Sequence, residues 1–330
     1  MAGCTRKIYG RTQRRFNMKL SLVVPCYNEE EVIYEFYKEV RKVFENKVSS
    51  YELVFVNDGS KDKTADILKA IHKVADNVKV VNFSRNFGKE AAMYAGLQQT
   101  CGEYTCVIDA DLQQRPEVVL EMMDILDNDE NVDCVAAYQE ARNESKLLTF
   151  FKDTFYKLMN NICDIEFYQG ASDFRLMRRP MVEAVLDMTE YHRFSKGIFS
   201  FVGFNTKYIP YEAQARVAGE SKWSFAKLFI YAIEGIVGYT TAPLKVASFA
   251  GIGLMLLAFL YMIIALIVGA ITYSITSAIA IITLILFMSG VNLLALGIIG
   301  EYLARTYMQG KNRPVFIAKE ILTYEEKESD

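Results

Sequence analysis

The feature that most constrains how this chain can fold is the segment 246–300, which contains no Lys, Arg, Asp or Glu. It holds two apolar runs, 246–270 and 278–299, and each is longer than the roughly 20 residues that a helix needs to cross a bilayer. Basic residues flank the outer ends of the runs: Lys222, Lys227 and Lys245 before them, and Arg305, Lys311, Arg313 and Lys319 after them. Because basic flanks tend to stay in the cytoplasm, the sequence predicts a transmembrane hairpin of two helices over 244–300, with both termini cytoplasmic. A hairpin buried inside a soluble protein is the alternative.

A different pattern fills the chain from Met18 to about Arg142, where short β-rich runs alternate with helical stretches. The predicted strands are Leu20–Pro25, Tyr51–Asn57, Val78–Phe83, Tyr104–Ile108 and Val132–Ala137. The predicted helices run from Glu29–Glu31 to about Phe44, and over Lys61–Val74, Lys89–Gln99 and Pro116–Leu126. Such alternation predicts an α/β domain whose mostly parallel sheet is covered by helices on both faces.

Two further segments have the pattern of amphipathic helices, at about 147–162 and at 223–241. Either helix could face the core of a soluble domain. Because both accompany the apolar runs, we expect them to lie at the membrane interface instead. The Glu- and Lys-rich tail after Lys319 is expected to be a solvated end of the cytoplasmic segment 301–330.

Composition excludes some classes of protein. A formal net charge of −3 over 330 residues, with both signs mixed, gives no indication of a nucleic-acid partner. The six cysteines form no C-x-x-C pair and the chain has two histidines, so a zinc cluster is not expected. This use of cysteine suits a reducing, cytosolic setting. Residues 1–17 form a basic extension without the apolar core of a signal peptide, and translation starting at Met18 is the interpretation that we favour.

Two acids follow the fourth predicted strand, Asp109 and Asp111, and they are separated by one residue. In an extended segment, residues two apart project to the same side. Carboxylates at strand ends lie where open α/β sheets bind ligands, and Mg²⁺ prefers such oxygen ligands together with substrate phosphates. Two solvated acids in a turn are the alternative for an isolated pair.

Four other segments combine turn residues with polar or charged side chains. Residues 25–30 and 57–62 follow the first two strands, and both could instead be helix caps. Residues 84–90 carry Arg85 and Lys89 near a helix start, which is a natural site for an anion. Residues 216–223 carry two cations just before the membrane segment, and surface charge is the alternative there.

Together these segments identify a resemblance. From Met18 to about Lys319 the chain resembles the polyprenyl-phosphate glycosyltransferases of glycosyltransferase family 2, which include bactoprenol glucosyltransferases and are similar to dolichol-phosphate mannose synthases. The resemblance implies a cytoplasmic GT-A-type domain over 18–222 that binds a nucleotide sugar, a juxtamembrane helix over 223–241 and a multi-pass anchor in the inner membrane. It also implies a polyprenyl-phosphate acceptor such as undecaprenyl phosphate, and it leaves open a homotetramer and a flippase partner.

The resemblance also implies roles for particular residues. The expected nucleotide-binding residues are Pro25, Tyr27, Asn28, Glu29, Asp58, Gly59, Lys89 and Asp109. Asp109, Asp111 and Gln113 are expected to hold Mg²⁺ or Mn²⁺, and Asp111 and Asp173 are the expected catalytic residues, with Asp173 as an orienting or charge-balancing group near the acceptor. The expected acceptor-phosphate residues are Arg216, Ser221 and Lys222, with Arg175 as a helper. The family often continues its acidic motif as Asp-Leu-Gln-Asp-Pro-Pro, whereas this chain has Gln114 and Arg115 in place of the last acid and the first proline.

The expected reaction transfers a sugar from a UDP-sugar to undecaprenyl phosphate with inversion, with glucose or N-acetylglucosamine as the sugar. Transfer of mannose from GDP-mannose to dolichol phosphate is one alternative. A processive polysaccharide synthase is another, but its Gln-x-x-Arg-Trp motif is missing here, and the single tryptophan, Trp223, lies in a different context. A non-catalytic membrane scaffold that binds nucleotide sugars is the third.

Overall fold

The computed structural model describes residues 18–139, 168, 171–212, 240 and 278–324, together with scattered positions from 244 to 267. The basic extension, the interface helix expected at 147–162 and nearly all of the segment 223–241 lie outside these residues. The predictions for those three segments therefore stay predictions.

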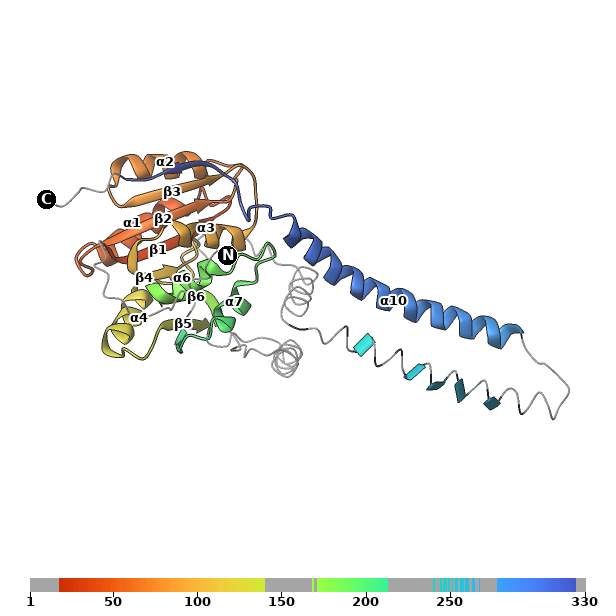
Figure 1. Ribbon diagram of the computed structural model, residues 1–330. Helices are drawn as coiled ribbons and strands as arrows, with labels where there is room; N and C mark the ends of the chain where they lie inside the picture. The colour runs from red at the N-terminus through yellow and green to blue at the C-terminus, as the bar shows by residue number, and fades with distance from the viewer. Residues whose placement is uncertain are drawn as a thin grey trace, which may run out of the picture.

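A mixed sheet forms the centre of the domain, and its strands lie in the order β7-β5-β6-β4-β1-β2-β3-β8 (Figure 1). The four strands β4, β1, β2 and β3 are parallel to one another, whereas β8 and β6 run antiparallel to their neighbours β3 and β4. The strands are β1 (Met18–Cys26), β2 (Tyr51–Asn57), β3 (Val78–Phe83), β4 (Gly102–Val107), β5 (Cys134–Gln139), β6 (Ala171–Arg178), β7 (Thr206–Tyr211) and β8 (Ala318–Leu322).

Helices cover both faces of this sheet. They are α1 (Ile33–Phe44), α2 (Thr64–Val74), α3 (Lys89–Gln99), α4 (Glu117–Asn128), α6 (Arg179–Asp187) and α7 (Ser195–Phe201). Alternate residues of β1 divide the core, because Leu22 and Val24 pack with α1 and α4 while Val23 packs with α3 and α6. The helix α3 lies very close to the sheet, since a Cβ on Gly96 would be 2.2 Å from Cγ1 of Val23. This α/β arrangement is the one that the alternating pattern predicts.

The predicted elements up to residue 139 all exist. The ranges predicted for β2, β3 and α3 agree with the structure residue for residue, and the others differ by a few residues at their ends. No element was predicted from the sequence where β6, α6, α7 and β7 lie; β6 and β7 complete the sheet on one side together with β5.

The prediction of a solvated tail after Lys319 is wrong for the residues up to Tyr324. The strand β8 pairs with β3, and the Tyr324 hydroxyl donates to Oε2 of the buried Glu52 at 2.7 Å. Partly buried and exposed side chains alternate along β8. Lys319 faces water, whereas Glu320 lies on the partly buried face, where it accepts a hydrogen bond from Asn82 at 3.1 Å and pairs with Lys69 at 2.8 Å. A short edge strand of this kind has the composition of a solvated tail, which is why the sequence alone did not separate the two.

One long apolar helix, α10 (Ala278–Gly310), projects from the domain (Figure 1). Among the described residues it is the one helix long and apolar enough to cross a membrane, over Phe287–Gly310, and none of that span is buried. The Tyr302 hydroxyl donates to the Thr240 carbonyl at 2.6 Å, so the chain just before the first apolar run lies against the end of α10. The described positions from 244 to 267 are helical, but the link at 271–277 lies outside the described residues.

Candidate active site

The residues expected to bind the nucleotide-sugar donor lie together at the carboxyl ends of the central strands, which form one edge of the sheet. Asp58 follows β2, Asp109 and Asp111 follow β4, and β1 lies between these two strands. The chain crosses from β1 to β2 on one side and reaches β4 on the other, so this edge is a topological switch point, where open α/β sheets bind their ligands. Pro25 is half-buried near the end of β1, and Tyr27 directly follows this strand.

Asp58 is 3% exposed and is held by the loop before α3. Its two carboxylate oxygens accept hydrogen bonds from the backbone N–H groups of Phe87, at 2.6 Å, and Gly88, at 2.9 Å. Burial raises the pKa of Asp58 above its ordinary value, although these two N–H groups oppose the shift. The contacts show that Asp58 organises the loop, whereas its expected contact with a base or ribose stays a prediction.

Gly59 allows the same two loops to approach each other. Its φ of +64° lies in the left-handed region, and a Cβ there would be 2.4 Å from the carbonyl carbon of Arg85. A side chain at this position would therefore push the β3–α3 loop away from the edge of the sheet.

The loops after β1 and β2 are also joined by side chains. Asn28, with a φ of +54°, donates its N–H to Ser60 Oγ at 3.0 Å and accepts the Lys61 N–H at 2.9 Å. The Glu29 N–H donates to Thr64 Oγ1 at 2.9 Å. These contacts fix the shape of the edge where the nucleotide is expected.

Lys89 connects the donor side of the site to Asp173. Its Nζ lies 2.7 Å from Oδ1 of Asp109 and 3.3 Å from Oδ2 of Asp173, which belongs to β6. Burial lowers the pKa of Lys89, but the charges of the two aspartates outweigh that effect and raise it. Lys89 is therefore a permanent cation between two acids.

Asp173 stays ionised in this setting. Burial raises its pKa, but Lys89, Lys196 and Arg175 oppose that effect, and the net shift is downward. Its second oxygen, Oδ1, is buried and has no hydrogen-bond partner among the described residues. A carboxylate with a lowered pKa is a weak base, so the geometry favours charge balance or orientation as its task.

The acidic motif itself forms a tight turn. Leu112 has a φ of +59°, and Oδ1 of Asp111 accepts the N–H of Gln113 at 3.1 Å. Gln114 is 6% exposed and holds Asp109 at two points, because its Oε1 accepts the Asp109 N–H at 2.9 Å and its Nε2 donates to Oδ2 of Asp109 at 3.1 Å. The residue that departs from the family pattern thus positions the first acid of the pair.

Most of the residues expected to bind the acceptor phosphate lie outside the described residues, namely Arg216, Ser221 and Lys222. Arg175 is described and is 4% exposed, with its guanidinium 3.8 Å from the centre of the Phe199 ring and one nitrogen donating to the Ser172 carbonyl at 3.0 Å. This placement does not favour direct contact between Arg175 and a lipid phosphate.

The donor set can be tested for its fit to a divalent cation. Among the described residues no three His, Cys, Asp or Glu side chains gather at one point. Two carboxylates at the switch point nevertheless fit Mg²⁺ or Mn²⁺, because Mg²⁺ in phosphate-transfer sites commonly uses one or two carboxylates and takes its other ligands from water and substrate phosphates. A cation would therefore bind here together with a diphosphate.

Comparison with known proteins identifies the family of the chain. The model of the family "Glycosyl transferase family 2" matches residues 21–186, which include the whole donor edge and Asp173. The chain belongs to glycosyl transferase family 2. It is 40% identical to the SfII prophage-derived bactoprenol glucosyl transferase of Shigella flexneri, over 92% of this chain and 98% of that protein.

Two further relatives cover similar lengths. A prophage bactoprenol glucosyl transferase homolog of Escherichia coli (strain K12) is 38% identical over 92% of this chain and 99% of its own. The uncharacterized glycosyltransferase YkcC of Bacillus subtilis (strain 168) is 39% identical over 94% and 96%. Among solved structures, glucosyl-3-phosphoglycerate synthase from Mycobacterium tuberculosis covers 67% of this chain and 78% of its own, with 20% identity and a TM-score of 0.45, a likeness too low to carry any part of the assignment.

Proposed function

We propose that this family 2 glycosyltransferase transfers glucose from UDP-glucose to undecaprenyl phosphate at the cytoplasmic face of the membrane. One observation carries the proposal: a paired-carboxylate site at the switch point and an unburied apolar helix occur in one chain. That combination suits a water-soluble donor and an acceptor that cannot leave the bilayer. The bactoprenol glucosyl transferases that align over 92% of the chain support the choice of sugar and lipid.

The donor would bind across the edge formed by Pro25, Tyr27, Asn28, Glu29, Asp58 and Gly59. Asp109, Asp111 and Gln113 would hold Mg²⁺ or Mn²⁺ against the diphosphate. When bound, the cation would neutralise negative charge on the departing UDP. Lys89 adds a permanent positive charge at the same place, since its Nζ lies 2.7 Å from Asp109.

The acceptor needs little help from a base. A phosphate monoester has its second pKa near 6, so at neutral pH it is largely dianionic and already nucleophilic. The task of the protein is then to bring two anions together, which cationic side chains favour. Asp173 holds Lys89 in place rather than removing a proton. Because the acceptor phosphate is itself the nucleophile, a single displacement with inversion is the course that the proposal assigns to the reaction.

The membrane parts complete the proposal. The contact between Tyr302 and Thr240, at 2.6 Å, supports a hairpin in which the two apolar runs are antiparallel and both termini are cytoplasmic. The helices expected at 147–162 and 223–241 would rest on the membrane surface, and Arg216, Ser221 and Lys222 would meet the lipid phosphate. A homotetramer and a flippase partner stay predictions.

The full-length enzyme in lipid vesicles, mixed with undecaprenyl phosphate or dolichol phosphate and a panel of nucleotide sugars, tests the proposal by mass spectrometry of the lipid. UDP-glucose should add one hexose, chelation should stop the reaction, and Mg²⁺ or Mn²⁺ should restore it. UDP-N-acetylglucosamine as the preferred donor would change only the sugar. Preference for GDP-mannose and dolichol phosphate would support the mannose synthase alternative, and no turnover of any donor would support the scaffold.

A further inference from the structure

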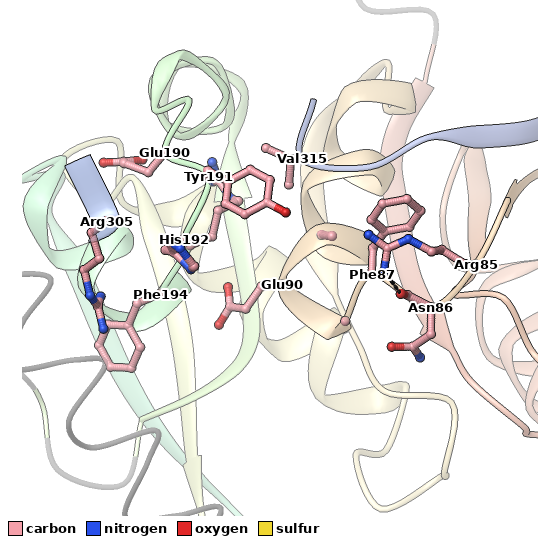
Figure 2. Close-up of a pocket in the computed structure, with 13 residues that line it drawn as sticks. Arg85, Asn86, Phe87, Glu90, Glu190, Tyr191, His192, Phe194, Arg305 and Val315 are labelled. Atoms are coloured by element: carbon pink, nitrogen blue, oxygen red, sulfur yellow. Dashed lines mark hydrogen bonds between the residues drawn. The ribbon is translucent and has the colours of Figure 1, made fainter. Parts of the chain in front are cut away.

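Glu90 is an acidic residue that the proposed reaction does not use, and it directly follows Lys89 in the first turn of α3. Its side chain lines a pocket of about 390 Å³ and lies between the loop before α3 and the loop 190–194 (Figure 2). An acid in the first turn of a helix is favourable by itself, because the helix dipole is positive there. That effect needs no partner, whereas Glu90 has a specific partner on another element.

The carboxylate of Glu90 holds the first residue of α7. Its Oε2 accepts hydrogen bonds from the Ser195 N–H, at 2.9 Å, and from the Ser195 hydroxyl. Ser195 is 5% exposed, and the residue before it, Phe194, makes no side-chain cap for this helix. The N–H groups in the first turn of a helix have no partner within the helix. Glu90 therefore supplies from α3 an acceptor that the residue before α7 cannot provide.

A second contact between α3 and the same segment lies one turn along the helix. Tyr94 is four residues after Glu90, so both side chains are on one face of α3. The Tyr94 hydroxyl donates to the Leu186 carbonyl at 3.3 Å, and the Arg193 guanidinium lies over the Tyr94 ring, 4.2 Å from its centre. The segment that joins α6 to α7 is thus attached to α3 near both of its ends, and Glu90 holds the end at α7.

The position of α7 affects the active site through Asp173. Burial raises the pKa of Asp173, but nearby positive charge outweighs that effect. This charge comes from Lys89, Lys196 and Arg175, and Lys196 is the second residue of α7. Phe199, also on α7, packs against Arg175, with 3.8 Å between its ring centre and the guanidinium. A movement of α7 would therefore change the charges around Asp173.

The contact between Glu90 and Ser195 depends on an acceptor oxygen more than on a full charge. Burial and the nearby charge of Asp173 raise the pKa of Glu90 to about 7, although the hydrogen bonds from Ser195 oppose the shift. At neutral pH the side chain is therefore ionised only part of the time. Both hydrogen bonds end on one oxygen, which a neutral amide of the same length could also provide.

We propose that Glu90 is a positioning residue for sugar transfer: by holding Ser195 it fixes the start of α7, and with it Lys196, beside Asp173. The proposal rests on the transfer reaction given above and adds a residue that acts without touching either substrate. Adjacent positions on a helix face different directions. One helix, α3, therefore contacts Asp173 through Lys89 and places α7 through Glu90. The two lysines keep a fixed arrangement around Asp173 as a result.

Glu90→Ala should lower kcat for glucose transfer to undecaprenyl phosphate by at least about tenfold per folded molecule, because misplacing a group by about 1 Å can cost about 100-fold. The KM for UDP-glucose should change less than about twofold, because the loss lies in placement and not in donor binding. Glu90→Gln should keep most of the wild-type kcat, because its amide oxygen can accept the same hydrogen bonds. Glu35→Ala removes an exposed acid from the first turn of α1 and is the control, with transfer unchanged.

A double-mutant cycle tests whether Glu90 acts through Ser195. Ser195→Ala should lower kcat by about threefold, because it removes the hydroxyl bond and keeps the backbone one. In the Glu90→Ala background the same change should have no further effect, since residues that act through one contact are not additive. A normal kcat in Glu90→Ala, an equal loss in Glu90→Gln, or effects that multiply in the double variant would each overturn the proposal.

Hydrogen exchange provides a measurement that does not need turnover. In the full-length enzyme in lipid vesicles, amides of the peptide 186–197 should exchange about tenfold faster in Glu90→Ala than in wild type, because local opening becomes easier. In Glu90→Gln they should exchange at the wild-type rate. Equal exchange in wild type and Glu90→Ala would contradict the hold on α7. If wild-type enzyme transfers no sugar to any polyprenyl phosphate, the proposed function fails; if it does and the Glu90 variants behave as wild type, only the role of Glu90 fails.

Discussion

Two lysines in this protein pair with carboxylates at opposite ends of the parallel strands, and their surroundings differ. Lys79 pairs with Glu52 at 2.9 Å, with side chains that are 10% and 0% exposed. Glu52 also accepts hydrogen bonds from Ser21, the Cys101 N–H and Tyr324. Lys89, in contrast, is 42% exposed beside Asp109 and Asp173, and one oxygen of Asp173 has no hydrogen-bond partner among the described residues.

The difference distinguishes a cluster that stabilises the fold, around Glu52, from one that is placed to take part in catalysis, around Lys89. The cluster around Glu52 is closed, because this acid accepts hydrogen bonds from four places in the chain, including Tyr324 just after β8. The cluster around Lys89 is open to solvent, and one oxygen of Asp173 could still accept a hydrogen bond from a donor on a bound ligand. The following substitutions should therefore affect stability at one edge of the sheet and catalysis at the other.

Asp111→Asn should have the largest effect at the open edge, lowering glucose transfer by about 10³-fold, because removing one electrostatic group from a preorganised site costs that much. Membrane insertion and the melting temperature should stay unchanged. Transfer of radioactive glucose to lipid measures the loss, and Asp124→Asn, at an exposed position of α4, is the control. Near-normal transfer by the Asn variant would remove Asp111 from the metal assignment.

Lys79→Met should lower the free energy of unfolding by about 3 kcal/mol, since it leaves the buried carboxylate of Glu52 without its ion partner. Chemical denaturation of the detergent-solubilised enzyme measures this change, while kcat per folded molecule should stay constant. If the stability of the variant were unchanged and kcat fell, the Lys79 cluster would have a catalytic role and the assignment would be wrong.

The cluster around Glu52 also predicts that the stability of the fold depends on pH. Burial raises the pKa of Glu52, but donors from Ser21, Cys101, Lys79 and Tyr324 outweigh it, so the folded pKa lies below its ordinary value. The stabilisation is then present above the unfolded pKa and is lost as the pH falls through the folded one. Melting temperatures between pH 7 and pH 3 should fall less steeply in Lys79→Met than in wild type, because fewer groups hold the ionised form.

Lys89→Met should lower kcat/KM by about 10²-fold with little change in stability, because its charge stabilises the reacting phosphates rather than the core. Losing this cation should also raise the pKa of Asp173, so the remaining activity should shift to higher pH. The comparison with Lys79→Met, the same change at the other edge, is the control. A large loss of stability with normal kcat would show that the Lys89 cluster is structural.

Gln114→Ala should have the smallest effect, a loss of about tenfold in kcat/KM at limiting Mn²⁺, since two hydrogen bonds hold Asp109 and each contributes about 1 kcal/mol. Saturating Mn²⁺ should recover part of the loss, and direct titration of Mn²⁺ with UDP should show weaker binding. Gln98→Ala, an exposed glutamine on α3, is the control. Equal metal affinity in the variant and wild type would limit Gln114 to a packing role.

The order of the strands explains which parts of this picture could be predicted. Strands such as β2 and β3 were predicted from local patterns because parallel strands buried on both faces are continuous apolar runs. The Asp109–Asp111 pair was found in the same way, since it follows such a run. The strand β6 was not predicted, although Asp173 was identified by resemblance, because its apolar residues are mixed with Asp173, Arg175 and Arg178. Gln114 was seen only as a departure from a motif, because its contact with Asp109 depends on a tight turn at Leu112.

By itself, the sequence determined the α/β domain, the apolar segment and the acids at a strand end, because periodicity and charge act over a few neighbouring residues. Only the tertiary structure decided that Lys89 contacts both Asp109 and Asp173, and that Tyr324, which follows α10 in the chain, contacts Glu52. Those contacts require β6 to insert beside β4 and β8 to add beside β3. Strand order is set by how the whole core packs, and no local pattern contains that information.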